Sequence, residues 1–392
     1  MNKCPCNSTM GNMVPSATLA ITSKAKALKA AGEDVCAMSA GEPDFNTFEV
    51  INQAAIKALN EGKTKYTPAS GIPELKKACA EKLIKDNGVA CAPEQVVIAP
   101  GAKFSCFTAI AALCGPGDEV IIPAPYWLSY PEMVRGVGAT PVFVNTKAKN
   151  NYELTAAELD AAITDRTKLL ILNTPSNPTG AVYCRKTLEE LAEVIIRRDI
   201  MVMSDEIYEK LVYDEKLPHI SIGSLSPEIN ERTITVNGFS KAYSMTGWRL
   251  GYLAAPLWLA KRIIALQSHT SSNATTFAQY GALAALAECD DQVEEMRKLF
   301  AKRRDLIVEL ISGIPEISVI YPTGAFYLFC NISAFGLSAD EFCNRLLEEG
   351  KVAAIPGEPF GAPDSIRLSY ACSEDNIRTA ISRLAEFCKK LK

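Results

Sequence analysis

The sequence has 392 residues, of which 48% are hydrophobic and 22% charged, so it is long enough for more than one folding unit with a sizeable core. Its 41 basic and 45 acidic residues give a net charge of −4, which argues against a nucleic-acid or anionic-membrane partner. No apolar run approaches the roughly 18 residues of a membrane-spanning helix, and the N-terminus lacks the apolar stretch of a signal peptide.

The 13 cysteines are scattered and odd in number, which does not suit a disulfide framework. Several lie in apolar helical runs, as Cys106 and Cys114 do, and this usage is typical of reduced, buried thiols in a cytoplasmic protein. Cys4 and Cys6 are the closest pair. With only two histidines in the chain and no CxxC motif, no metal site is expected.

Apolar runs with the character of strands recur between about residues 95 and 255. They are QVVIAPGAK, DEVIIPAP, TPVFVNT, TKLLILNTPSNPTG, IMVMSDEIYE, RTITVNGFSK and RLGYLAA. Helical patterns lie between most of them, such as TLEELAEVIIRRD, in which Leu188, Leu191 and Ile195 share one face. Strands that are apolar on both faces and alternate with helices predict a mainly parallel sheet in an α/β layer.

Polar residues gather where these runs end. Lys103 follows the first run, Asn177 another, Asp205 ends the next, and Ser240 and Lys241 come after TITV. Ligands of open α/β sheets bind outside the carboxyl ends of the strands, so these side chains are expected to meet at one crevice.

The character of the sequence changes after about residue 290. A long amphipathic helix, VEEMRKLFAKRRDLIVELI, precedes the short strand-like runs GAFYLFC and SIRLSYA. The final helix is expected to begin after Ser373 as its N-cap, with Glu374 and Asp375 in the first turn. This part is predicted to form a smaller α+β unit.

Lys241 is the first candidate for chemistry. It is one of only two charged residues in NGFSKAYSMTGWRLGY, the other being Arg249. Apolar surroundings favour the neutral amine, which is a nucleophile able to form a Schiff base with a carbonyl or with pyridoxal phosphate. The alternative is an ordinary surface lysine on a loop.

Three further features favour a pyridoxal phosphate site. The turn APGAKF brings Gly101 and Ala102 to a helix N-terminus, where backbone N–H groups can bind phosphate. Asp205 ends a strand and could pair with a pyridine nitrogen, although it could also be a helix N-cap. Arg249 suits phosphate, although it could form a structural ion pair.

The motifs SKAYSMTGWRLGY, NTPSNPTGAVY, SDEIYE, PAPYWLSYPEMVR, AGEPDF, GKTKYTPASGIPEL and IRLSYA together resemble the motif set of class I aminotransferases, in the same order, from about Pro15 to the C-terminus. The sequence is most similar to the bacterial branch of aspartate and prephenate aminotransferases. The resemblance implies the pyridoxal-phosphate-dependent aspartate aminotransferase fold (fold type I). It implies a large cofactor domain over residues 47–295 with a seven-stranded sheet, and a small domain formed by residues 1–46 and 296–392.

The resemblance also implies roles for individual residues. Lys241 is expected to bind the cofactor as a Schiff base and to act as general base in a ping-pong reaction. The residues expected to contact the cofactor are Gly101, Ala102, Lys103, Ser240 and Arg249 at the phosphate, Asp205 at the ring nitrogen, Trp127 on the ring face, and Asn177 and Tyr208 at the phenolic oxygen. Tyr66 is expected to reach the phosphate bound by a neighbouring subunit, which requires a homodimer with shared active sites.

The substrate is expected to be an amino acid or a 2-oxo acid with two carboxylates. The resemblance implies that Gly41 and Arg367 hold the α-carboxylate, and that Trp127 and Asn177 also contact the substrate. Lys103, with Ser16 and Thr18 nearby, is expected to bind the distal carboxylate. The segment 268–276 has no arginine for that task. Aspartate and glutamate, with 2-oxoglutarate and oxaloacetate, are the predicted substrates, and prephenate is the alternative.

Other interpretations of the same residues remain open. Trp127 and Tyr208 could be core aromatics, Asn177 a turn residue before Pro178, and Arg367 a partner of a structural acid. Among functions, a C–S β-lyase would keep Lys241 and differ in how the carbanion reacts. A regulatory protein with a silent cofactor fold and a generic α/β binding domain are the remaining alternatives.

Overall fold

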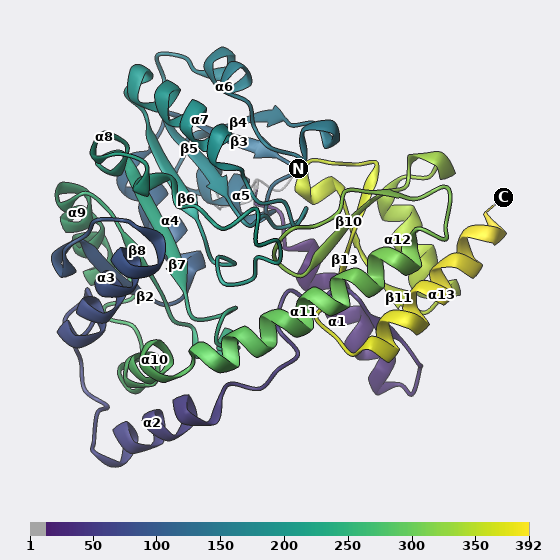
Figure 1. The fold of residues 1–392 in the computed structure, drawn as a ribbon, viewed down its shortest axis with the longest axis horizontal. Coiled ribbons are helices and arrows are strands. Elements are labelled where there is room, and N and C mark those ends of the chain that lie inside the picture. The colour runs from purple at the N-terminus through teal and green to yellow at the C-terminus, as the bar shows by residue number, and fades with distance from the viewer. Residues whose placement is uncertain (1–12, 392) are drawn as a thin grey trace, which may run out of the picture.

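Seven strands form the large sheet of the protein, in the spatial order β2-β8-β7-β6-β5-β3-β4 (Figure 1). A computed structural model describes the chain over residues 13–391, apart from the side chain of Leu19. The strands of this sheet are β2 (Val96–Ala99), β3 (Glu119–Ala124), β4 (Thr140–Asn145), β5 (Thr167–Asn173), β6 (Met201–Asp205), β7 (Thr233–Gly238) and β8 (Gly251–Ala254). They coincide with the seven apolar runs, so the predicted α/β sheet is confirmed.

The sheet is mainly parallel, as the apolar runs predict. Neighbours from β7 to β4 pair in parallel, for example Val202 with Thr233. Of the described strands in this sheet, only β8 runs against its neighbours, with Leu253 opposite both Val97 and Val236. Every residue of β7 is buried, which explains why that run is apolar on both faces.

Helices cover both faces of this sheet. Cys106 and Ile110 of α4 (Ala102–Leu113) pack with Val97 on one face, together with α5 (Ser129–Gly136) and α9 (Leu257–Ser268). The other face carries α3 (Pro73–Asn87), α6 (Ala156–Ala162), α7 (Arg185–Arg198), α8 (Pro227–Asn230) and α10 (Thr276–Glu288). Outside these layers, α2 (Glu49–Asn60) packs along α10.

Two helices agree with specific predictions from the sequence. In α7, Leu188, Leu191 and Ile195 are buried on one face. Ser373 caps α13 (Glu374–Lys390) by accepting a hydrogen bond from the backbone N–H of Asn376 at 3.2 Å. The predicted N-cap of the final helix is therefore confirmed.

A second, antiparallel sheet has the order β12-β13-β10-β9. Its strands are β9 (Ser318–Val319), β10 (Tyr327–Asn331), β12 (Ile355–Pro356) and β13 (Ser365–Ser369), and α12 (Ala339–Glu349) lies with them. The short strand β1 (Cys36–Ala37) pairs in parallel with β11 (Val352–Ala353). Ala25 of α1 (Ala17–Ala30) is buried with Leu347 and Ala353, so the N-terminal helix packs on the C-terminal part of the chain.

The long helix α11 (Asp290–Ile311) links the two groups of elements, as Figure 1 shows. It crosses residues 295 and 296 without a break. The division into domains at that point stays a prediction, and residues 1–12 of the proposed small domain lie outside the described part of the chain.

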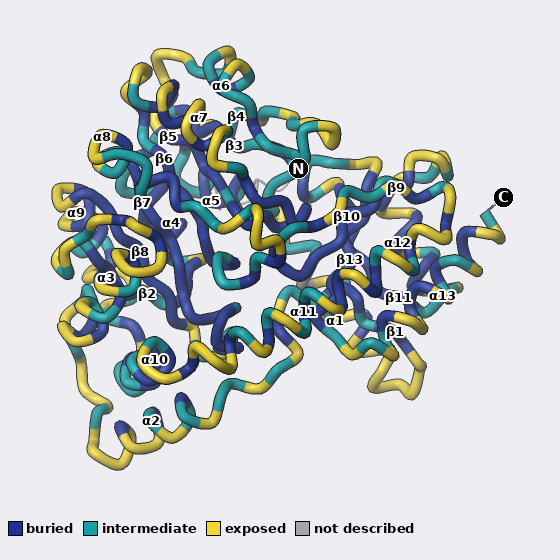
Figure 2. Tube along the Cα trace, in the orientation of Figure 1, coloured by how far each residue is buried: buried dark blue, intermediate teal, exposed yellow. Residues whose placement is uncertain are grey.

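Burial follows these layers: the inner strands of the large sheet are dark blue in Figure 2, whereas the edge strand β4 is only partly buried or exposed. The exposed residues lie mainly on outer helices and turns, and α2 presents Ile56 and Leu59 to solvent. Among the helices of the described residues, none is long and apolar enough to cross a membrane.

Candidate active site

A cavity of about 440 Å³ opens beside the carboxyl ends of β5, β6 and β7. Thirteen of the residues singled out in the sequence line it: Ser16, Thr18, Gly41, Ala102, Lys103, Trp127, Asn177, Asp205, Tyr208, Ser240, Lys241, Arg249 and Arg367. Residues separated by more than 300 positions are thereby brought to one place. The polar residues do meet at one crevice at this edge of the sheet.

Lys241 is partly buried in the turn that follows β7. Its Nζ donates a hydrogen bond to the backbone carbonyl of Gly41. Burial lowers the pKa of Lys241 to about 8, and although Glu42 opposes this shift, Arg367 and Arg249 add to it. An ammonium with that pKa loses its proton around pH 8 instead of around pH 10.5, which makes the neutral amine far more available as a nucleophile and a base.

Asp205 is buried at the last position of β6. Its Oδ2 accepts hydrogen bonds from the Tyr130 hydroxyl at 2.7 Å and the Cys106 thiol at 3.6 Å, and its Oδ1 accepts one from the backbone of Ile207 at 3.3 Å. Burial raises the pKa of Asp205, while these three donors oppose the rise. The donors therefore favour the ionised carboxylate, which burial disfavours.

An anion cradle lies where β2 turns into α4. Gly101 is the N-cap of α4 with φ +91°, and a Cβ atom there would approach Nη2 of Arg249 to 2.5 Å. Arg249 itself is held by a hydrogen bond of 2.9 Å from its Nη1 to the carbonyl of Thr246. Backbone N–H groups at this helix N-terminus, the Ser240 hydroxyl and a guanidinium suit a phosphate. Gly101 supports the cradle without lining the cavity.

Arg367 is a fully buried cation from β13 of the second sheet. Its Nη1 donates to Oδ1 of Asn177 at 2.8 Å, its Nη2 donates to the carbonyl of Ser39 at 3.1 Å, and its guanidinium lies 4.3 Å from the ring centre of Tyr327. Its Nε is buried and has no hydrogen-bond partner among the described residues. A buried, incompletely paired guanidinium is suited to a carboxylate ligand.

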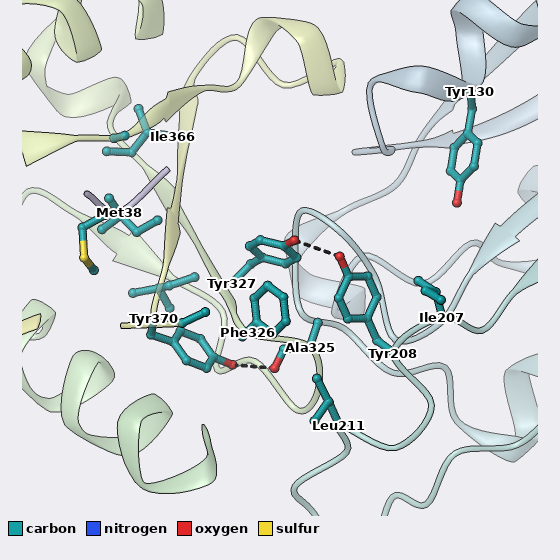
Figure 3. Packing of buried hydrophobic residues seen from close by; sticks show 14 of the residues in the cluster. Met38, Tyr130, Ile207, Tyr208, Leu211, Ala325, Phe326, Tyr327, Ile366 and Tyr370 are labelled. Atoms are coloured by element: carbon teal, nitrogen blue, oxygen red, sulfur yellow. Dashed lines mark hydrogen bonds between the residues drawn. The ribbon is translucent and has the colours of Figure 1, made fainter. Parts of the chain in front are cut away.

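Two tyrosines close the cavity between the two sheets. The hydroxyl groups of Tyr208 and Tyr327 lie 2.8 Å apart, and Figure 3 shows this bond beside Phe326. Tyr208 follows β6 and Tyr327 begins β10, so the bond connects the large sheet to the small one. Tyr208 therefore faces the cavity rather than only the core.

Lys103 and Trp127 lie together on another wall, with Nζ of Lys103 4.8 Å from the ring centre. Desolvation within the cavity lowers the pKa of Lys103, and the neighbouring charge of Arg249 adds to this effect. Thr18 of α1 also lines the cavity, and its buried hydroxyl has no hydrogen-bond partner among the described residues.

Tyr66 lies outside this cavity and is 90% exposed. Because Tyr66 does not line the cavity of its own chain, the role predicted from the sequence needs a second subunit.

A model of the aminotransferase class I and II family matches residues 33–384. The chain belongs to this family. It is 48% identical to an aspartate aminotransferase of Geobacillus stearothermophilus over 383 residues, covering 96% of this chain and 97% of the relative. It is 47% identical to a probable aspartate/prephenate aminotransferase of Aquifex aeolicus, covering 98% of each.

Solved structures agree with this family. The aspartate aminotransferase of Thermus thermophilus with maleate superposes with a TM-score of 0.94 at 41% identity, covering 98% of this chain and 100% of the other. The Rhizobium meliloti aspartate aminotransferase gives a TM-score of 0.94 at 39% identity. The resemblance and the fold inferred from the motifs are confirmed, and the protein is an aminotransferase.

Several residues of this aminotransferase's cavity escaped the sequence analysis. Thr22 and Lys26 line it from α1, and their spacing of four from Thr18 places all three on one helix face, a signal that was available. Tyr327 and Tyr130 reach the cavity only through packing of distant elements, so no local pattern revealed them.

Three side chains of the kind that bind metal ions, Glu206, Glu209 and His219, lie close together in the segment that follows β6. Lys82 donates to Glu209, and Ser221 donates to Glu206 at 2.5 Å. The ammonium of Lys82 therefore forms an ion pair with the carboxylate of Glu209. Cys4 and Cys6, the other group considered for metal, lie outside the described residues.

Proposed function

We propose that this chain is a pyridoxal-phosphate-dependent aspartate aminotransferase, which moves an amino group between aspartate or glutamate and oxaloacetate or 2-oxoglutarate. The observation that carries the proposal is the single cavity in which Lys241, Asp205, Arg249, Arg367 and Lys103 meet. The names of the relatives support the same reaction.

The residues present fit pyridoxal phosphate. The cradle of Gly101, Ser240 and Arg249 would hold the phosphate, and a Cβ atom at Gly101 would obstruct it. Asp205, with its paired carboxylate, would face the ring nitrogen. The remaining ring contacts would come from Trp127, Asn177 and Tyr208. When bound, the cofactor supplies an aldehyde that condenses with amines and a pyridine ring that accepts an electron pair.

The protein's own groups supply binding and proton transfer. Arg367 binds the α-carboxylate through its unpaired Nε and one of the two Nη protons that Asn177 and Ser39 do not accept, which orients the amino acid's α-carbon. Lys241, with a pKa near 8, accepts the α-proton on Nζ and releases it in the second half of the transfer. The same lysine serves both half-reactions of a ping-pong scheme.

A dicarboxylic substrate is supported by Lys103. This lysine stands in the first turn of α4, where the helix dipole disfavours a cation by roughly 0.3–1 kcal/mol, and an anionic ligand offsets that cost. Ser16 and Thr18 contribute polar groups to the same cavity. An amino-donor and acceptor panel tests the proposal: aspartate with 2-oxoglutarate should yield glutamate, and absence of turnover in cofactor-loaded protein would contradict it.

Prephenate is the second candidate acceptor, favoured by the presence of both Thr18 and Lys103 in the cavity. Turnover of prephenate with glutamate or aspartate as donor supports this activity, and absence of turnover removes it. A C–S lyase on the same scaffold would instead release pyruvate and ammonia from a suitable donor without an acceptor.

We also propose a homodimer with shared active sites and a cytoplasmic location. The exposed Tyr66 and the apolar residues Ile56 and Leu59 on α2 support a contact between copies of the chain. Buried thiols such as Cys79 and Cys330, whose pKa values burial raises, support a reducing compartment.

A further inference from the structure

Asp205 has an unequal set of hydrogen bonds on its two carboxylate oxygens. Oδ2 accepts from both Tyr130 at 2.7 Å and Cys106 at 3.6 Å, whereas Oδ1 accepts only a backbone bond of 3.3 Å from Ile207. With one backbone donor, Oδ1 keeps acceptor capacity. One oxygen is therefore occupied by the protein, and the other is available to a ligand in the cavity.

We propose that Tyr130 and Cys106 are positioning residues that hold Asp205 ionised, with Oδ1 directed at the cofactor's ring nitrogen. This inference rests on the proposed function, because it assigns a task toward pyridoxal phosphate. Both residues act through the carboxylate.

The two donors come from helices that belong to the cavity wall. Cys106 lies one turn into α4, whose N-terminus forms the anion cradle, and Tyr130 is in the first turn of α5. In Figure 3, Tyr130 lies in the same half of the view as Ile207 and Tyr208. The ring of Tyr130 also meets the ring of Trp127 edge to face, with centroids 5.2 Å apart. Tyr130 thus supports both Asp205 and the residue expected to cover the cofactor ring.

Both groups remain proton donors near neutral pH. Burial raises the pKa of Tyr130 and of Cys106 well above their ordinary values, and the charge of Asp205 raises both further. Among the described residues, Glu206, Lys241 and Tyr208 also interact electrostatically with Asp205. Of these, Glu206 raises the pKa of Asp205, so the donated bonds oppose both burial and a neighbouring carboxylate.

Loss of the donors makes the carboxylate more basic. The proton shared between Asp205 and the ring nitrogen then moves toward the carboxylate, and the ring becomes a weaker electron acceptor. Tyr130→Phe removes the shorter bond and Cys106→Ala the longer one, so the double variant should show the largest effect.

The test loads the enzyme with pyridoxal phosphate labelled with ¹⁵N in the ring and measures the ¹⁵N chemical shift at neutral pH. The resonance should be that of a protonated ring in the native protein. It should move toward the neutral-ring value in the order Cys106→Ala, Tyr130→Phe, double variant. kcat should fall by about tenfold in Tyr130→Phe with KM for aspartate nearly unchanged.

Matched controls separate this effect from general loss of packing. Tyr183→Phe removes another buried tyrosine hydroxyl, which accepts a bond of 2.9 Å from the backbone of Leu154. Cys114→Ala removes a buried thiol at the other end of α4. Neither control should move the resonance.

The outcomes are distinct. A double variant that binds cofactor and keeps the native resonance overturns the inference while leaving the proposed function intact. If Tyr130→Phe does not fold, Cys106→Ala alone must still shift the resonance in the stated direction, and an unchanged resonance overturns the inference. A native protein that takes up no pyridoxal phosphate overturns the proposed function instead.

Discussion

Arg367 donates a hydrogen bond of 2.8 Å from Nη1 to Oδ1 of Asn177, so the small sheet and the loop after β5 share one polar contact inside the cavity. Arg367→Lys should lower kcat/KM for aspartate by about 10²–10³, because a lysine cannot keep this bond and also bind a carboxylate with two parallel donors. Steady-state kinetics measures the loss. Arg345 forms an exposed ion pair with Glu349, so Arg345→Lys serves as the control and should leave kcat/KM unchanged. Equal kinetics in the two variants would contradict the assignment.

Lys103 offers a test of substrate class. Lys103→Met should raise KM for 2-oxoglutarate by about tenfold or more, since it removes a charge-assisted hydrogen bond to the distal carboxylate. Pyruvate has no distal carboxylate, so its KM should not change. The exposed Lys149 provides a control substitution, Lys149→Met. A weaker affinity for the cofactor with unchanged KM values would instead show that Lys103 binds the phosphate.

The lowered pKa of Lys241 predicts how the stability of the cofactor-free protein depends on pH. This pKa of about 8, against an ordinary value of 10.5, means that the folded cofactor-free protein binds the proton less tightly than the unfolded chain. Stability should therefore rise between about pH 8 and pH 10.5, where the unfolded chain alone is protonated. Below pH 8 the buried charge costs at most about 3 kcal/mol, and solvent in the cavity reduces that cost.

Lys241→Met should accordingly stabilise the cofactor-free protein by about 1–3 kcal/mol near neutral pH, and by less than half as much near pH 9.5. Urea unfolding at the two pH values measures the difference. The exposed Lys186 serves as the control, and Lys186→Met should be neutral at both. A gain that does not depend on pH would show that packing rather than charge is responsible.

Tyr66 tests the shared active site. Tyr66→Phe should weaken cofactor binding by about tenfold if its hydroxyl reaches a phosphate in the neighbouring subunit. Within one chain the side chain is 90% exposed and does not line the cavity, so the substitution should leave the cofactor affinity of a monomeric enzyme unchanged. Equilibrium titration of cofactor-free protein gives the affinity, with Tyr321→Phe, another exposed tyrosine, as the comparison.

The sequence predicted those parts of the structure that local patterns determine. Buried strands such as TITVNG are apolar on both faces, and Asp205 and Lys241 stand where strands end, so both the sheet and the crevice could be inferred. The contact from Tyr130 to Asp205 spans 75 positions and depends on how α5 packs against α4 and the neighbouring strands β3 and β4. No local sequence pattern predicts a contact over that separation along the chain, nor the contact between Tyr208 and Tyr327.

The most direct measurement reduces the cofactor-loaded protein with borohydride and maps the modified peptide by mass spectrometry. Lys241 is the only lysine in NGFSKAYSMTGWRLGY, so the adduct can be assigned to one side chain. The account predicts a pyridoxyl group on its Nζ and none in Lys241→Met. Folded, cofactor-supplied protein that carried the label on another lysine, or carried none, would contradict it.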